Sequence, residues 1–100
     1  MESFSFETKG NQILNQRSHV GVVGSGDLEV LIEPGNNNKA IFNVRTASEG
    51  FQETWKAVFE RFMDINEVVA TITINDFGAT PGVVALRLAQ ALEIAKQNKD

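Results

Sequence analysis

Apolar and polar residues alternate along three stretches of the chain, the pattern of β-strands with one buried face. These stretches are 28–33, 40–45 and 68–75, and a short valine-rich run at 19–23 predicts a fourth strand. In the first stretch Leu28, Val30 and Ile32 fall on one face, and acidic residues fall on the other. Phe4 and Phe6 also alternate, which leaves open whether the first seventeen residues add an edge strand.

Spacings of three and four residues separate the apolar side chains between residues 51 and 63, which predicts an amphipathic helix. This stripe, whose aromatic members are expected in the core, comprises Phe51, Trp55, Val58, Phe59, Phe62 and Met63. Ser48 is expected to cap the helix, and Glu49 suits the positive end of its dipole. The charged residues, mostly off the stripe, are Glu53, Lys56, Glu60 and Arg61.

A second helix is expected to begin at Thr80 and Pro81, since threonine caps helices and proline is favoured at the first helical position. Its predicted buried residues are Val84, Leu88, Ala91, Leu92 and Ala95, and its predicted solvated residues are Arg87, Gln90, Glu93 and Lys96. The order is therefore β-β-β-α-β-α. We expect one α+β domain over residues 1–100, with an antiparallel or mixed sheet of about four strands packed against two helices.

Composition narrows the classes of function. The 100 residues carry a formal net charge of -4, which argues against nucleic acid and anionic membranes as partners. The chain has no Cys and one His, so it offers neither a thiol nucleophile nor a multi-histidine metal site. The N-terminal residues lack the basic and apolar regions of a secretory signal, so we expect a cytoplasmic protein.

Ser25 is the leading candidate for chemistry. It lies between Gly24 and Gly26, at the expected tip of a hairpin formed by the strands at 19–23 and 28–33. A side chain at such a tip projects into solvent, and the glycines let a bulky group approach the backbone. Asp27 is expected to bond to local backbone and fix the turn, and the whole segment is also compatible with turn chemistry alone.

The sequence offers three other candidate sites. The glycines at 21, 24 and 26 do not form a dinucleotide loop, because a strand and not a helix follows them. A triad of His19, Ser25 and Asp27 has poor geometry, because His19 and Ser25 are six residues apart along an extended strand. The loop at 75–82 is expected to connect a strand to a helix, and an ion pair between its Asp76 and Arg45 is left open.

Two stretches together resemble the malonate decarboxylase acyl carrier protein family, the delta subunit of that complex. They are GVVGSGDLEVLIEP at 21–34 and INDFGATPGVVALRL at 74–88, and shorter matches lie at 45–46, 50–55 and 60–62. The first stretch is more distantly similar to the acyl carrier subunit of citrate lyase. That family has a second serine where this chain has Gly26, which favours the malonate system.

The resemblance implies that Ser25 carries a phosphoribosyl-dephospho-CoA prosthetic group through a phosphodiester bond. The thiol of this group would bear acetyl and malonyl thioesters, which explains how a chain without Cys serves thioester chemistry. The chain itself would have no catalytic residue and no metal. Implied partners are the acyl-transferase and decarboxylase subunits and the prosthetic-group transferase, with no nucleic acid or membrane.

The fold is expected to differ from the four-helix bundle of other acyl carriers, because too many residues alternate with a period of two. Asp27, Glu29 and Glu33 would suit docking on basic partner surfaces. The alternatives are a carrier of the citrate lyase type, an assembly subunit that never receives the group, and a small serine hydrolase.

Overall fold

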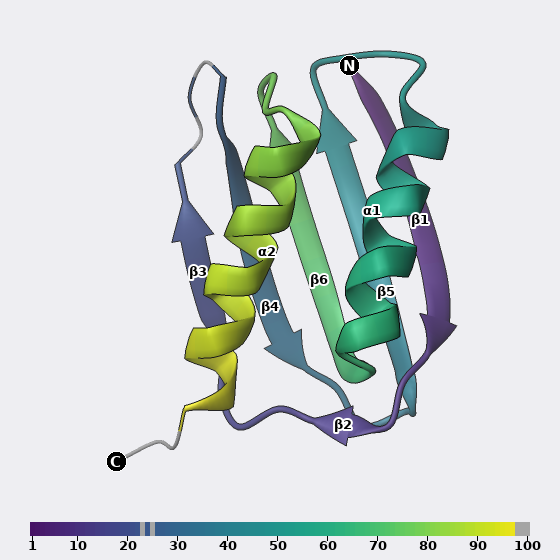
Figure 1. The fold of residues 1–100 in the computed structure, drawn as a ribbon, viewed down its shortest axis with the longest axis vertical. Helices are drawn as coiled ribbons and strands as arrows, with labels where there is room; N and C mark the ends of the chain where they lie inside the picture. Colours follow the sequence, from purple (N-terminus) through teal and green to yellow (C-terminus); the bar gives the residue numbers. More distant parts are fainter. Residues whose placement is uncertain (23, 25, 98–100) are drawn as a thin grey trace.

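Six strands and two helices make up the part of the chain described by the computed structural model, residues 1–22, 24 and 26–97. The elements are β1 (Glu2–Lys9), β2 (Gln12–Ile13), β3 (Ser18–Gly21), β4 (Leu28–Pro34), β5 (Lys39–Thr46), α1 (Gln52–Ile65), β6 (Val68–Asp76) and α2 (Pro81–Lys96). Both helices lie on one face of the sheet (Figure 1). The predicted α+β class is confirmed, with β1 and β2 in addition to the four expected strands.

The sheet is mixed, with the strand order β1-β5-β6-β4-β3. β5 and β6 run parallel because α1 carries the chain back between them, and the other neighbours in this order are antiparallel. The short β2 pairs with the first residues of β6. β6 is therefore the central strand, bonded on both sides.

The open question about the N-terminal segment is settled by β1, which forms an edge strand along β5. Phe4 lies opposite Val44, and Phe6 lies opposite Phe42. Burial alternates along β1, and both phenylalanines pack against the core. The alternation read from Phe4 and Phe6 thus marks a real strand.

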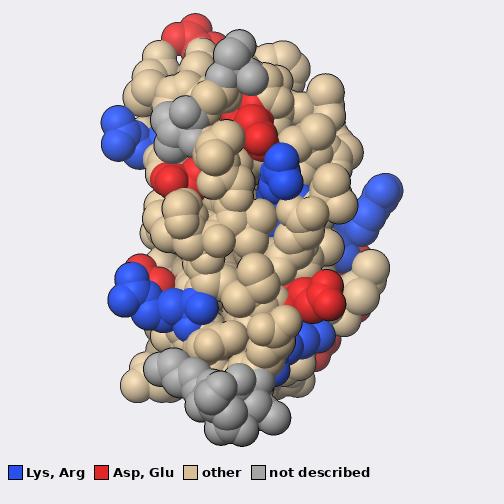
Figure 2. Space-filling view, turned by 90° about the vertical axis from the view of Figure 1, so that its left-hand side faces the viewer, with Lys and Arg blue, Asp and Glu red and all other residues tan. Residues whose placement is uncertain are grey.

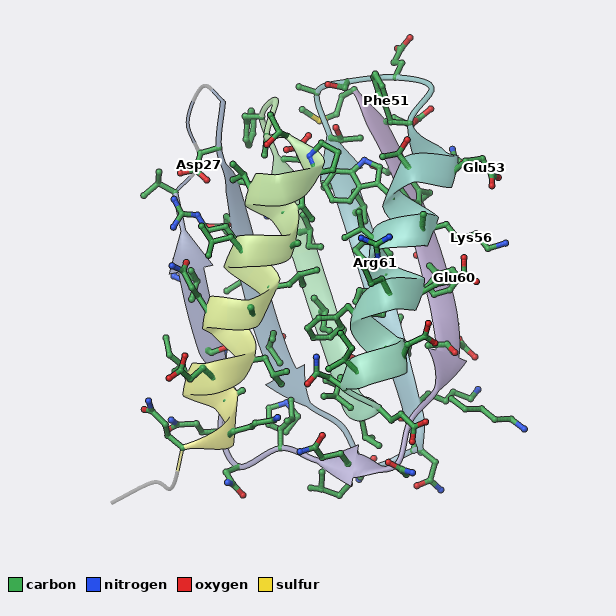
Figure 3. All side chains as sticks on the ribbon, in the orientation of Figure 1. Asp27, Phe51, Glu53, Lys56, Glu60 and Arg61 are labelled. Atoms are coloured by element: carbon green, nitrogen blue, oxygen red, sulfur yellow. The ribbon has the colours of Figure 1, made fainter. Side chains whose placement is uncertain are left out.

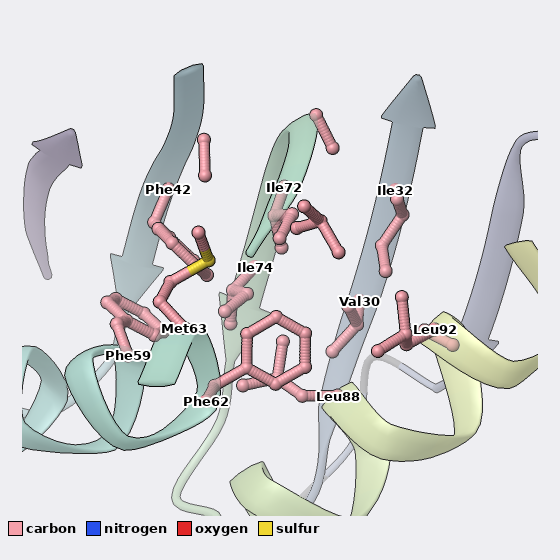
Figure 4. Packing of buried hydrophobic residues seen from close by; sticks show 14 of the residues in the cluster. Val30, Ile32, Phe42, Phe59, Phe62, Met63, Ile72, Ile74, Leu88 and Leu92 are labelled. Atoms are coloured by element: carbon pink, nitrogen blue, oxygen red, sulfur yellow. The ribbon is translucent and has the colours of Figure 1, made fainter. Parts of the chain in front are cut away.

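The core lies between the sheet and the two helices (Figure 4). Phe42 of β5 stacks on Phe59 of α1 with ring centroids 4.2 Å apart, and the predicted β4 face (Leu28, Val30, Ile32) is fully buried. The five α2 residues predicted to be buried are all buried. Apolar periodicity located the core because each element presents one face to the same layer.

Two expectations at the start of α1 are wrong. Phe51 is not core but 52% exposed, because it occupies the position before the first helical residue and so lies outside the stripe. Ser48 does not cap α1, since the helix begins at Gln52 without a side-chain cap; the backbone N–H of Ser48 instead donates to Thr46 Oγ1 (3.1 Å). At α2 the prediction is confirmed, with Thr80 Oγ1 accepting from the Val83 N–H (3.3 Å).

Among the described residues, no helix has the length and apolar character needed to cross a membrane.

Phe59→Ala is expected to lower the free energy of unfolding by about 3–5 kcal/mol, because it removes a fully buried ring stacked on Phe42. Phe51→Ala is the matched control, with an expected loss of about 1 kcal/mol or less because half of this side chain is already in water. Urea unfolding followed by circular dichroism measures both. Equal losses in the two variants would contradict this description of the core.

Candidate functional site at the β3–β4 turn

The hairpin predicted around the glycine-rich segment is present. β3 and β4 pair antiparallel from Ser18 opposite Ile32 to Gly21 opposite Glu29, so β3 ends two residues earlier than expected. Ser25, the residue singled out by the sequence, lies outside the described residues. The geometry of the site therefore comes from the residues on either side of it.

Glycine is required at two positions of the turn. Gly21 has a φ of 90°, and a Cβ there would lie 2.1 Å from the carbonyl oxygen of Leu28. Gly26 has a φ of 76°, and no atom lies within 4 Å of where its Cβ would be. A left-handed φ strains any residue with a Cβ. The Asp27 N–H donates to the Gly24 carbonyl (3.1 Å), so the turn closes tightly and its Gly26 side faces open space.

The loop between β6 and α2 supports this turn from the neighbouring strand. The Gly26 N–H donates to the Phe77 carbonyl (2.8 Å), and the Phe77 N–H donates to the Asp27 carbonyl (2.9 Å). These two bonds continue the antiparallel pairing of β4 with β6, before the first residue of β4 and after the last residue of β6. The base of the turn is thereby tied to the central strand of the sheet.

Asp27 joins the turn to α2. Arg87 Nη2 lies 3.0 Å from Asp27 Oδ2, and Arg87 Nε donates to Asp27 Oδ1 at 3.2 Å, which makes a two-pronged pair. The Asp27 and Arg87 side chains are only 22% and 29% exposed. Figure 3 shows Asp27 at the end of the hairpin beside α2. The expectation that Arg87 is solvated is therefore wrong, because α2 packs over β3 and β4 and brings this residue to the turn.

This arrangement lowers the pKa of Asp27. The main cause is the hydrogen bonding from Arg87, followed by the Leu28 N–H, which donates to Oδ1 at 2.7 Å. Both stabilise the ionised carboxylate. The expected bond between Asp27 and local backbone is thus present. The contact with Arg87, which lowers the pKa more, was not predicted from the sequence.

His19 is bound to a different carboxylate. Its Nε2 lies 3.0 Å from Glu29 Oε2, while Asn75 Nδ2 donates to Glu29 Oε1 (2.8 Å). The hydrogen bond from Asn75, and after it the one with His19, lowers the pKa of Glu29. Because His19 pairs with Glu29 and Asp27 pairs with Arg87, the triad weighed from the sequence has no base and acid aligned with each other.

Asp76 is buried at the end of β6, with 3% of its surface exposed. Thr46 Oγ1 donates to its Oδ2 (2.8 Å), and the Ala79 N–H donates to its Oδ1 (2.9 Å). The ion pair left open with Arg45 does not form. Thr46 is the register partner of Asp76 in the parallel pair, so Arg45 faces the opposite side of the sheet.

The Asp27 carboxylate is expected to titrate below the usual value of about 3.9 in the native chain. The pairing therefore adds stability above that pH and loses it as the pH falls through the lowered pKa. In Arg87→Gln the titration midpoint should rise towards the usual value. Arg17→Gln, which removes an exposed guanidinium elsewhere, should leave it unchanged. Carbon-detected NMR of the carboxyl group measures the midpoint, and an unshifted Asp27 in the native chain would contradict the assignment.

Asp76→Ala is expected to cost about 1–3 kcal/mol in the free energy of unfolding, because it leaves the Thr46 hydroxyl and the Ala79 N–H without their buried acceptor. Asp64→Ala, which removes an exposed carboxylate from α1, is the control and should change stability by less than about 0.5 kcal/mol. Chemical denaturation compares the two. A loss as small as that of the control would show that the Asp76 bonds contribute little.

Known proteins resemble this chain in sequence and in overall fold. Residues 15–95 match the family model for the malonate decarboxylase delta subunit (MdcD). Two curated relatives named malonate decarboxylase acyl carrier protein, from Azotobacter vinelandii and Pseudomonas syringae pv. tomato, are 51% and 52% identical over 93% of this chain and 95% of their own length.

A solved chain has the same fold. It comes from the crystal structure of a Pseudomonas malonate decarboxylase hetero-tetramer in complex with malonate, with a TM-score of 0.90 and 48% identity, covering 95% of this chain and 99% of that one. The family model, the relatives and the shared fold agree over nearly the whole length. This chain therefore belongs to the malonate decarboxylase acyl carrier protein family.

Proposed function

We propose that this chain is the acyl carrier subunit of a cytoplasmic malonate decarboxylase and performs no chemistry of its own. It would hold acetyl and malonyl groups as thioesters and present them to the acyl-transferase and decarboxylase subunits. The observation that carries the proposal is the β3–β4 turn, which is tight, contains glycines and lies at one end of the molecule (Figure 1), in a chain that has no Cys. Its base is bonded to the sheet and to α2, while its Gly26 side is open.

Ser25 is the proposed point of attachment, through a phosphodiester bond to phosphoribosyl-dephospho-CoA. This group supplies the thiol that the sequence lacks. The surroundings of the turn leave room for such a prosthetic group. Nothing lies within 4 Å of the position that a Gly26 Cβ would take, and the nearest atom to a Cβ built on Gly24 belongs to the Val22 side chain, 3.9 Å away. The nearby His19 and Asp27 are both bound to other side chains, so the attaching transferase would supply the base.

The residues at the base of the turn would fix the position of the attached prosthetic group. The bonds from Phe77 and the pair between Asp27 and Arg87 hold the base of the turn at one place, so an attached arm would pivot about a fixed point. An arm anchored in this way reaches several partner sites at a high effective concentration without being released between them. A partner then needs to recognise only one carrier orientation.

Charge steering by the turn is weaker than expected. Of the three acidic residues assigned to docking, Asp27 is paired with Arg87, and Glu29 bonds to His19 and Asn75. Glu33 is exposed, but it lies at the other end of β4 from the turn, with Arg17 Nε 3.9 Å away. Acidic and basic side chains also lie close to one another on this side of the molecule (Figure 2), which weakens the attraction of the carboxylates near the turn to a basic partner surface.

Intact-mass analysis of the carrier purified from its native host tests the proposal. A hydrolysable adduct on the peptide containing Ser25 is expected, whereas unmodified serine in an active complex would favour an assembly subunit. Ser25→Ala should abolish turnover of the complex while changing the free energy of unfolding by less than about 0.5 kcal/mol. Ser3→Ala, an exposed serine on β1, is the control and should retain both the activity and the adduct on Ser25.

Esterase activity of the isolated chain tests the serine hydrolase alternative. We expect none, because the acid of the proposed triad, Asp27, is held by Arg87, and His19 lies back from the turn on β3, opposite Leu31. Activity that disappears in His19→Ala would instead favour a hydrolase.

A further inference from the structure

A groove runs between α1 and α2 on the helical side of the molecule. Two adjoining cavities of about 420 and about 500 Å³ form it, and both are lined by Thr54, Val58 and Pro81. Most of the remaining lining is apolar, including Trp55 in the first cavity and Leu88 in the second. Cavities of this size with mainly apolar walls and a few polar groups are typical of small-molecule sites.

The groove begins next to the β3–β4 turn. Gly78 lines its first cavity, and a Cβ built on Gly78 would lie 3.8 Å from the backbone nitrogen of Gly26. From there the groove follows α1, whose 14 residues span about 21 Å, as far as Asn66. A long flexible chain anchored at the turn therefore meets the groove at its near end.

Arg61 is the charged residue of the second cavity. Figure 3 shows it lying between the two helices, whereas Glu53, Lys56 and Glu60 point away on the outer side of α1. Within residues 1–22, 24 and 26–97, no carboxylate pairs with Arg61. The carboxylate of the first cavity, Asp76, is already bonded to Thr46 and Ala79. The groove thus combines apolar walls with one unpaired guanidinium.

We propose that this groove receives the acyl-bearing end of the chain's own arm, and that Arg61 pairs with the terminal carboxylate of a malonyl group. The proposal rests on the carrier function proposed above. A pantetheine chain is uncharged: its methylene and methyl groups suit the apolar walls, and its amides can bond to polar lining residues such as Thr54 and Asn66. Malonyl differs from acetyl by the carboxylate that a guanidinium binds. The malonyl form docks more tightly than the acetyl form, so the carrier shelters the group that awaits decarboxylation and exposes the acetyl form to exchange.

The exposure of Arg61 determines how strongly the groove should prefer malonyl over acetyl. Arg61 is a surface residue, and exposed ion pairs contribute little. We therefore expect malonyl-pantetheine to bind roughly 1.5- to fivefold more tightly than acetyl-pantetheine.

Titration of the unmodified, isotope-labelled chain with these two thioesters, followed by NMR, measures this ratio. Amide shifts should concentrate on groove residues such as Ala57, Ala85 and Ala89. In Arg61→Gln the ratio should fall to about one. In Lys56→Gln, which removes the same charge from the outer side of α1, it should stay at the native value. A preference that survives Arg61→Gln, or shifts confined to the uncovered sheet face, would overturn the proposal.

A tethered arm tests whether the groove is within reach. Because the chain has no Cys, Ser25→Cys introduces a single thiol, to which a malonyl-amide pantetheine can be coupled through a spacer that restores the length of the phosphoribosyl-dephospho-CoA group. Shifts at the same groove amides are expected, and they should weaken in Arg61→Gln. Their absence in the tethered chain would overturn the proposal even if the free thioesters bind. Chemical coupling bypasses the transferase, so this result is independent of whether native mass analysis finds an adduct on Ser25.

Discussion

The central position of β6 is the constraint from which the candidate site follows. β6 is hydrogen-bonded to β4 on one side and to β5 on the other, and at its end Asp76, Phe77 and Gly78 lie beside the hairpin turn. Asp76 bonds back to β5 through Thr46, and Phe77 bonds forward to the turn. The same few residues therefore lock the sheet, support the turn and line the entrance of the groove.

The turn combines a rigid base with an open end. Main-chain bonds to Phe77 and the pair between Asp27 and Arg87 restrain its base, while Gly26 leaves open space beside it. A site that had to catalyse would need polar groups converging on one atom, with at least one of them uncommitted. Here the polar groups near the turn are paired with each other, Asp27 with Arg87 and Glu29 with His19 and Asn75. This suits a turn whose serine is modified by another protein and then carries the attached group.

Electrostatics keeps this arrangement in place at neutral pH. The pKa values of Asp27 and Glu29 are both lowered by hydrogen bonds to their ionised forms, from Arg87 and Leu28 in one case and from Asn75 and His19 in the other. Their stabilising contributions are therefore present above the ordinary carboxyl pKa and are lost only as the pH falls through the lowered values. The carboxylates of Asp27 and Glu29 are therefore ionised at neutral pH and accept these hydrogen bonds.

The sequence by itself determined the α+β class, the four main strands, both helices, the capping by Thr80 and the hairpin with glycines at its bend. These features depend on residues a few positions apart, so a local pattern contains them. It could not determine that Arg87 meets Asp27, that Glu29 joins His19 to Asn75, or that Thr46 and not Arg45 meets Asp76. Nor could it show that Arg61 faces a groove between the helices. Each of these contacts depends on strand order, register and the rotation of a helix over the sheet, which arise only when segments far apart in the chain pack together.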